Sequence, residues 1–149
     1  MQVNNVKKAI FIGSVGCGKT TLCQRILDEN IEYKKTQTVQ FYAKSSLVDT
    51  PGEFTDNRRL YSALSVTAND VDLIFLLQSV VEKRQTFAPG FGGMFSKPII
   101  GIVTKIDLAK QQDELTYAKS QLVMAGAQKV IFVSSKENKG INEVKKILQ

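Results

Sequence analysis

The chain has 149 residues, with 20 Lys and Arg against 14 Asp and Glu, and carries a formal net charge of +6. Its hydrophobic fraction of 43% and charged fraction of 23% exclude a disordered chain, and its length predicts one domain over residues 1–149. Because histidine is absent, Ser-His and Cys-His nucleophile pairs and His-ligated zinc are excluded. The positive charge fits either an anionic ligand or lysines that keep a small protein in solution.

Location and large partners are predicted from what the sequence lacks. Cys17 and Cys23 are too few for a disulfide framework, which favours a reducing cytoplasm. The longest purely apolar stretch, residues 73–77, is too short to span a membrane, and the first residues do not resemble a signal peptide. No segment mixes basic and aromatic residues as single-strand nucleic-acid binders do. We therefore expect a cytoplasmic protein without membrane or nucleic-acid partners.

Strands and helices are predicted to alternate along the chain. In chain order we expect a strand at 9–12, a helix at 20–27, short strands at 39–42 and 46–48, a helix after residue 57, strands at 71–77 and 99–103, a helix around 115–125, a strand at 130–133 and a helix around 141–148. The apolar run at 9–12 is typical of a strand that is buried on both faces. The pattern predicts an α/β fold with a mainly parallel sheet and one short antiparallel hairpin, turning at Lys44 and Ser45.

A phosphate-binding loop is predicted between the first strand and the first helix. Residues 13–20 match G-x-x-x-x-G-K-[ST] in the strand–loop–helix context that its mechanism requires. The glycines let successive backbone N–H groups point at a phosphate, and the helix start adds its dipole. Lys19 supplies a point charge, and the Thr20 hydroxyl can bind Mg²⁺. The expected phosphate-binding residues are Gly13, Val15, Gly16, Cys17, Gly18, Lys19, Thr20 and Thr21.

Three further motifs follow later strands. In Asp49-Thr50-Pro51-Gly52, the aspartate would lie near Mg²⁺ and the glycine N–H could sense a γ-phosphate. In the T-K-x-D motif at 104–107, the carboxylate could accept bonds from N1–H and N2–H₂ of guanine, which adenine does not offer. The S-S-K motif at 134–136 could present a backbone N–H to O6 of guanine. The expected guanine-binding residues are Thr104, Lys105, Asp107, Ser134, Ser135 and Lys136.

In this order the four motifs resemble those of small Ras-like GTPases of the translation-factor class. Within that class the chain is most similar to the bacterial EutP/PduV family. The closest matches are Lys35-Thr36-Gln37, Asp49-Thr50-Pro51-Gly52-Glu53, Leu60-Tyr61-Ser62-Ala63-Leu64, Pro89-Gly90-Phe91 and Ala125-Gly126-Ala127-Gln128-Lys129. The resemblance covers nearly the whole chain and implies a three-layer P-loop NTPase domain that binds GTP, GDP and Mg²⁺. It also implies a link to bacterial microcompartments that break down ethanolamine or propanediol.

The resemblance also implies roles for residues of the switch segments. Thr36 belongs to the family's Lys-Thr-Gln and is the expected switch hydroxyl, with Thr38 as the competitor. The expected metal ligands are Thr20, Thr36 and Asp49. The expected catalytic residues are Lys19, Gly52 and Glu53.

Three residues depart from the Ras-like pattern. Thr104 stands where Asn is usual, and its shorter side chain leaves one bond to guanine unmade, worth on the order of 1 kcal/mol. Glu53 replaces the Gln that orients the attacking water, so its carboxylate adds negative charge beside an anionic γ-phosphate. Val15 replaces the small Gly that admits an arginine finger, so that route of activation is not expected. We expect slow intrinsic GTP hydrolysis.

Other interpretations of the same residues stay open. The resembled family includes proposed acetate kinases, and a non-catalytic scaffold could keep the fold and its nucleotide. The irregular segment that begins at Glu82 and ends at Ser96 either folds over the core or forms a docking patch for a microcompartment shell or enzyme protein. Cys17 is either a redox-sensitive thiolate among loop amides or a small side chain that faces away from the phosphates.

Overall fold

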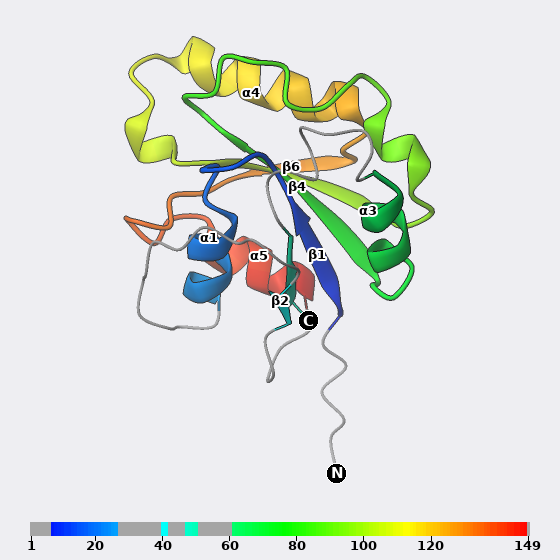
Figure 1. Ribbon diagram of the computed structural model, residues 1–149. Coiled ribbons are helices and arrows are strands. Elements are labelled where there is room, and N and C mark those ends of the chain that lie inside the picture. The colour runs from blue at the N-terminus through cyan, green and yellow to red at the C-terminus, as the bar shows by residue number, and fades with distance from the viewer. Residues whose placement is uncertain (1–6, 27–39, 42–46, 51–60, 149) are drawn as a thin grey trace.

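The computed structural model describes residues 7–26, 40–41, 47–50 and 61–148 (Figure 1). In chain order its elements are β1 (Ala9–Ile12), α1 (Lys19–Ile26), β2 (Gln40–Phe41), β3 (Leu47–Asp49), α3 (Tyr61–Ala68), β4 (Leu73–Ser79), the 3₁₀ helix η2 (Phe91–Met94), β5 (Ile99–Thr104), the 3₁₀ helix η3 (Ile106–Leu108), α4 (Gln112–Ala125), β6 (Lys129–Phe132) and α5 (Ile141–Leu148). The predicted alternation of strands and helices is confirmed over these residues. Within them, no helix has the length and apolar character needed to cross a membrane.

One six-stranded sheet carries these elements, in the order β2-β3-β1-β4-β5-β6. β1 pairs in parallel with β3 and β4, β4 with β5, and β5 with β6, whereas β2 runs antiparallel to β3. The predicted α/β fold with a mainly parallel sheet is therefore confirmed. The predicted turn at Lys44 and Ser45 lies outside the described residues.

Helices cover both faces of the sheet (Figure 1). Phe11 and Phe75 of the central strands stack at 4.9 Å between ring centroids on the face covered by α1 and α5. The alternating residues Ile10, Ile12 and Leu76 face α3 and α4 on the other side. Because β1 and β4 are buried on both faces, apolar side chains are favoured on both sides of these strands, which explains the unbroken apolar runs at 9–12 and 73–77.

Some strand boundaries differ from the predicted ones. β4 begins at Leu73 rather than at residue 71, because Val71 lies in the turn that ends α3. It continues to Ser79, two residues further than predicted, because this last residue pairs with Thr104 of β5. β6 covers Lys129–Phe132 and is shifted by one residue from the prediction. Hydrogen-bonded pairing with neighbouring strands determines where these strands end, and the hydrophobic pattern of the sequence carries no information on that pairing.

The segment at 82–96 packs over the chain's own core. Phe87 and Phe91 are 1% and 5% exposed, and their ring centroids lie 5.0 Å apart. Phe91 also makes edge contacts with Tyr61 and Phe95, at 5.3 and 5.7 Å between centroids. Of the two predicted roles for this segment, packing over the core accounts for the two phenylalanines that are most buried.

The carboxyl ends of the parallel strands meet at one edge of the sheet. β1, β3, β5 and β6 run in the same direction, and each is followed by one of the four motifs that the sequence singles out. In open α/β sheets, ligands bind outside this edge. The topology therefore brings the described parts of these four segments to one edge of the sheet.

Candidate functional site

The phosphate loop joins β1 to α1 at this edge. Gly16 and Gly18 have φ angles of 80° and 100°, in the left-handed region that a side chain would strain. The Gly18 carbonyl accepts a bond from Leu22 N–H at 2.9 Å, so α1 starts directly after this glycine. The first N–H groups of a helix have no acceptor within it and favour an anion. The predicted strand–loop–helix context is confirmed.

The Lys19 ammonium lies against this loop. Its Nζ donates to the carbonyl oxygens of Gly13 and Ser14 at 2.8 and 3.2 Å, and the residue is only 6% exposed. Among the described residues, no carboxylate pairs with this ammonium. Its Nζ also lies 3.9 Å from Cys17 Sγ, and a buried cation held by neutral carbonyl and thiol groups favours an anionic ligand. The loop thus combines amides with a charge of the required sign.

Cys17 belongs to the core. It is 2% exposed and packs with the residues beneath α1 and α5. A methyl group placed on Gly13 would lie 2.5 Å from its Sγ, so the sulfur occupies the space beside that glycine. Cys23 is also fully buried. Cys17 is thus a buried side chain whose Sγ also lies 3.9 Å from Lys19 Nζ, and the two interpretations of this residue stay predictions.

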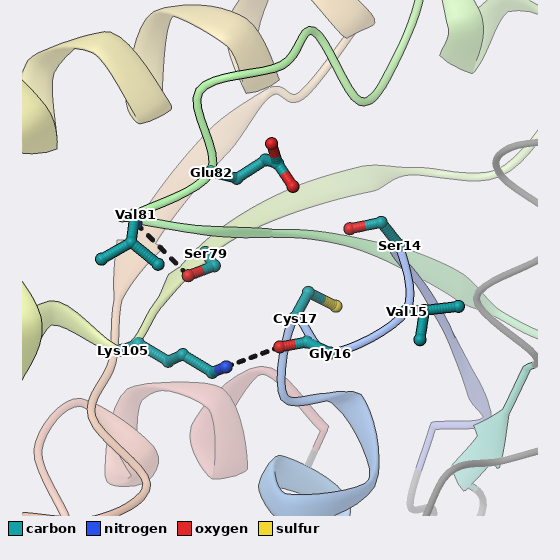
Figure 2. A pocket seen from close by; sticks show the side chains of 8 residues that line it. All are labelled: Ser14, Val15, Gly16, Cys17, Ser79, Val81, Glu82 and Lys105. Atoms are coloured by element: carbon teal, nitrogen blue, oxygen red, sulfur yellow. Dashed lines mark hydrogen bonds between the residues drawn. The ribbon is translucent and has the colours of Figure 1, made fainter.

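Two residues at the end of β5 hold the phosphate loop from outside. The Thr104 hydroxyl donates to the Cys17 carbonyl at 2.5 Å. Lys105, which has a φ of 59°, donates from Nζ to the Gly16 carbonyl at 2.5 Å (Figure 2). The carbon stem of Lys105 also passes Gly18, since a methyl there would lie 3.8 Å from its Cε. The T-K pair of the third motif therefore braces the first motif.

Asp107 is held by a serine of the last motif. The Ser134 hydroxyl donates to Asp107 Oδ1 at 2.7 Å and accepts a bond from Glu137 N–H at 3.0 Å. Ser134 is fully buried, whereas Asp107 is half-buried. One carboxylate oxygen is therefore fixed by a protein donor, and the carboxylate keeps further acceptor capacity for a ligand.

The backbone amide of Ser134 is engaged within the protein. Its own N–H donates to the Lys139 carbonyl at 3.0 Å, and its carbonyl accepts Lys139 N–H at 2.9 Å, so this amide is not available to a base. In a trans peptide the C=O and the next N–H point in opposite directions. The N–H of Ser135 therefore points away from Lys139.

These residues enclose a pocket of about 240 Å³. It is lined by Gly18, Thr21, Thr104, Lys105, Asp107, Leu108, Ser135 and Lys136. Five of the six expected guanine-binding residues line it, and Ser134 lies behind them as the partner of Asp107. Gly18 and Thr21 connect it to the start of α1, so the phosphate loop and the pocket form one continuous site.

A smaller cavity of about 130 Å³ lies beside residues 14–17 of the loop and shares Lys105 with the larger pocket (Figure 2). Glu82 and Ser14 point toward it, and Val15, at 44% exposed, lies on its rim. The main-chain N–H of Arg84 and its guanidinium bond the carboxylate and hold the pKa of Glu82 below its ordinary value. This cavity therefore carries a carboxylate charge beside the phosphate loop.

The expected metal ligands are described only in part. Thr20 is the second residue of α1 and is 8% exposed. Asp49 ends β3, where its backbone lies opposite Phe11 of β1. The described part of the chain holds no cluster of three His, Cys, Asp or Glu side chains suited to a metal. Mg²⁺ commonly uses one or two protein ligands together with phosphates and waters, so Thr20 and Asp49 stay a prediction.

The remaining expected residues lie outside the described ones. These are Thr36 with its competitor Thr38, and the pair Gly52 and Glu53. The segment that leads to this pair is anchored, because the fully buried Thr50 donates its hydroxyl to the Phe11 carbonyl at 2.7 Å.

Sequence reasoning missed Arg25. Its Nε donates to the Ser135 carbonyl at 2.7 Å, and one terminal nitrogen lies 3.5 Å from the Lys136 carbonyl. In the sequence this residue is one of 20 basic residues, at the end of a helix where a cation is favoured in any case. A sequence pattern gives no sign that it reaches a loop 110 positions away.

Fold and site together define the class of protein. A mainly parallel sheet with a phosphate loop between β1 and α1 is the fold of P-loop NTPases. The chain belongs to the PduV-EutP family, described as ethanolamine utilisation - propanediol utilisation, whose family model matches residues 6–149. The predicted family membership is confirmed.

Individual relatives support the same family and fold. The chain is similar to the propanediol utilization protein PduV of Citrobacter freundii, with 43% identity over 139 residues that cover 93% of this chain and 91% of the relative. It is similar to the probable acetate kinase EutP of Escherichia coli, with 35% identity over 104 residues, 69% of this chain and 65% of the relative. GTPase Era of Erythrobacter litoralis is 28% identical over 159 residues, 92% of this chain and 52% of the relative.

Proposed function

We propose that this chain binds GTP and GDP together with Mg²⁺, hydrolyses GTP slowly, and acts as a nucleotide switch. The single observation that carries the proposal is the Asp107 carboxylate, fixed by Ser134 in a pocket that is continuous with the phosphate loop. A fixed carboxylate at the base end of such a site favours a base with two adjacent N–H donors. Guanine has this donor pair and adenine does not.

The phosphate end of the site supports a di- or triphosphate ligand. Lys19 carries a buried positive charge that contacts two carbonyl oxygens and the Cys17 sulfur, and that pairs with no carboxylate among the described residues. A phosphate oxygen is a stronger acceptor for this ammonium than a neutral carbonyl. Binding of the nucleotide would therefore draw the Lys19 side chain from the carbonyls of the loop to the phosphates.

The base end supports guanine by two groups that act on different atoms. Asp107 would accept from N1–H and N2–H₂, while the Ser135 N–H would donate to O6. Lys105 would lie with its carbon stem beside the base, since its ammonium is held at Gly16. Thr104 is engaged with Cys17 and adds no bond to the base, so we expect micromolar affinity more readily than picomolar affinity.

The metal and switch parts of the proposal use residues identified in the sequence. Mg²⁺ would be held by Thr20, Thr36 and Asp49 and would neutralise phosphate charge. The γ-phosphate would order the segments of Thr36 and Gly52, and hydrolysis would release them. Glu53 adds negative charge near the γ-phosphate, which is why hydrolysis is expected to be slow.

We place this switch in the cytoplasm, at a bacterial microcompartment that degrades ethanolamine or propanediol. The support is the family description and the name of the PduV relative. The nucleotide state would control contact with a shell or enzyme protein. Parts of the 82–96 segment remain available for this contact, although Phe87 and Phe91 are already used in the core.

A second candidate is a phosphotransferase of the acetate kinase type. The name of the EutP relative favours it, and the same phosphate loop could hold the donor nucleotide. With ATP as donor, the carboxylate of Asp107 would lack the N–H pair that we expect it to bind. The two candidates therefore differ in base preference and in the need for acetate.

Binding and turnover of the Asp107→Asn variant test the proposal. GTP, GDP, ATP and XTP are titrated with Mg²⁺ against wild type, Asp107→Asn and the control Asp113→Asn, which changes an exposed carboxylate at the start of α4. We expect GDP affinity to fall about 10- to 100-fold in Asp107→Asn, from the loss of hydrogen bonds to a charged acceptor, and preference to move to xanthine. The control is expected to behave as wild type.

Phosphate release, measured with and without acetate, separates the candidates. Slow release from GTP that is independent of acetate supports the GTPase. Preference of wild type for ATP, together with acetate-dependent turnover, would overturn the GTPase in favour of the kinase. Absence of binding to any of the nucleotides would overturn both and leave a scaffold.

A further inference from the structure

Arg25 joins the phosphate-loop helix to the tip of the last motif. It lies in the last turn of α1, four residues after Thr21 of the pocket and therefore on the same face of the helix. Its Nε donates to the Ser135 carbonyl at 2.7 Å, and its terminal nitrogen lies 3.5 Å from the Lys136 carbonyl. The planar guanidinium suits two neighbouring acceptors, which a lysine ammonium does not match in the same way.

The two carbonyl contacts fix which way the amides of the tip point. In a trans peptide the N–H points opposite to the preceding C=O. The Lys136 carbonyl faces Arg25, and the following N–H of Glu137 accordingly faces the interior, where it donates to the Ser134 hydroxyl at 3.0 Å. The bond of the Lys136 carbonyl to Arg25 and the bond of the Glu137 N–H to Ser134 therefore fix the same peptide group from opposite sides.

A continuous chain of hydrogen bonds then leads from Arg25 to the Asp107 carboxylate, which is proposed to bind the base. It runs from the guanidinium to the Lys136–Glu137 peptide, from that peptide to the Ser134 hydroxyl, and from the hydroxyl to Asp107 Oδ1 at 2.7 Å. Ser134 is itself fixed by its paired backbone bonds to Lys139. The tip at 135–136 lies between this fixed pair and Arg25, so Arg25 is the side chain that orients it.

We propose that Arg25 is a positioning residue for base recognition, which orients the Ser135–Lys136 tip and, through Ser134, the Asp107 carboxylate. This inference rests on the proposed guanine nucleotide function. Arg25 touches no base itself. Through Arg25, base recognition depends on α1, the helix that begins at the phosphate loop. The parts of the protein that bind the phosphates and the base are therefore connected by hydrogen bonds.

The ratio of affinities for GDP and IDP tests this role. IDP lacks the N2 amino group, so the ratio reports how well Asp107 is aimed at guanine. In Arg25→Ala we expect the preference for GDP over IDP to fall about fivefold, which is the size expected for one hydrogen bond. A loss of general stability would weaken both nucleotides in proportion and leave the ratio unchanged. Arg25→Lys is expected to restore part of the preference, because an ammonium can still reach one carbonyl.

Two further variants make the test specific. Ser134→Ala removes the middle of the chain of hydrogen bonds, so the double variant Arg25→Ala, Ser134→Ala is expected to lose no more preference than Ser134→Ala alone. Arg84→Ala removes a surface guanidinium that pairs with Glu82 and is expected to leave the ratio unchanged. An unchanged ratio in Arg25→Ala, or fully additive losses in the double variant, would overturn the inference. Equal affinity of wild type for GDP and ADP would instead overturn the proposed function.

Discussion

The two ends of the candidate site are built in different ways. The phosphate end is one continuous segment at 13–20, in which backbone groups and Lys19 supply the interactions. The base end is assembled from the segments after β5 and β6 and from α1, held together by side-chain bonds of Ser134 and Arg25, while Thr104 joins it to the phosphate loop. The first depends on local chain geometry and the second on contacts between distant residues.

This difference decides how each end tolerates change. A loop whose shape is set by its own backbone is disturbed mainly by substitutions within it. A pocket held by single hydrogen bonds between elements loses its alignment when any one of them is removed, at about 1 kcal/mol for each bond. We therefore expect large effects on overall affinity from the phosphate end, and smaller effects on base preference from the base end.

Removal of Lys19 is expected to have the largest effect. In Lys19→Ala the ammonium that would bind two phosphate oxygens is lost, and affinity for GDP should fall about 100-fold, which corresponds to about 3 kcal/mol. Because the contact is to phosphates, affinity for IDP should fall by the same factor. Titration calorimetry with both nucleotides measures this.

Lys129→Ala serves as the control for charge, since Lys129 is exposed at the start of β6. The nucleotide-free Lys19→Ala protein is expected to melt no lower than wild type, because a buried cation is removed. Retention of wild-type affinity for GDP in Lys19→Ala would show that the phosphate loop is not the ligand site.

Gly140 lies in the loop that follows the S-S-K motif, directly after Lys139, which pairs with Ser134. Its substitution is expected to have the second largest effect. Gly140 has a φ of 75°, and a methyl group there would collide with the Phe132 carbonyl and lie 3.1 Å from Val133 Cγ1. Gly140→Ala should therefore lower the free energy of unfolding by about 2 kcal/mol. The displaced loop carries Ser134, so the GDP to IDP ratio should fall as well.

Gly93→Ala is the matched control for Gly140→Ala. Gly93 lies in η2, and a methyl group there meets no atom within 4 Å. Its unfolding free energy and nucleotide preference should stay close to those of wild type. Denaturant unfolding and the two titrations measure both quantities. A Gly140→Ala protein with wild-type stability and ratio would mean that the loop adapts without loss of alignment.

The sequence predicts the phosphate end far better than the base end, for a physical reason. The pattern at 13–20 consists of glycines that permit left-handed backbone, beside an apolar run that must form a buried strand. Each of these signals acts within a few residues. The same holds for the order of strands and helices, which follows from local hydrophobic patterns.

The base end could be predicted only as a set of residue types. The sequence marks Asp107 and the S-S-K motif, but it does not tell that Ser134 serves the carboxylate rather than the ligand. It also gives no sign that Arg25 reaches the tip of a loop 110 positions away. Such pairings are products of the folded topology, and a single sequence carries no local pattern for them.

The smallest expected effect belongs to Thr104, which stands where the two ends meet. Thr104→Val keeps the branched shape and removes only the hydroxyl that donates to the Cys17 carbonyl. Because this bond braces the phosphate loop, affinity for GDP and IDP should fall together, each by about fivefold, for a loss of about 1 kcal/mol. Titration of both nucleotides against the variant measures the two factors.

Thr104→Ser keeps the hydroxyl and should retain most of the affinity, which separates loss of the bond from loss of packing. The losses of affinity for GDP and for IDP in Thr104→Val decide whether this residue belongs to the phosphate end or to the base end. Equal losses assign it to the phosphate end, although it also lines the pocket beside Asp107. A selective loss for GDP would assign it to the base end, and the division between a local phosphate loop and a long-range base pocket would then fail at its boundary.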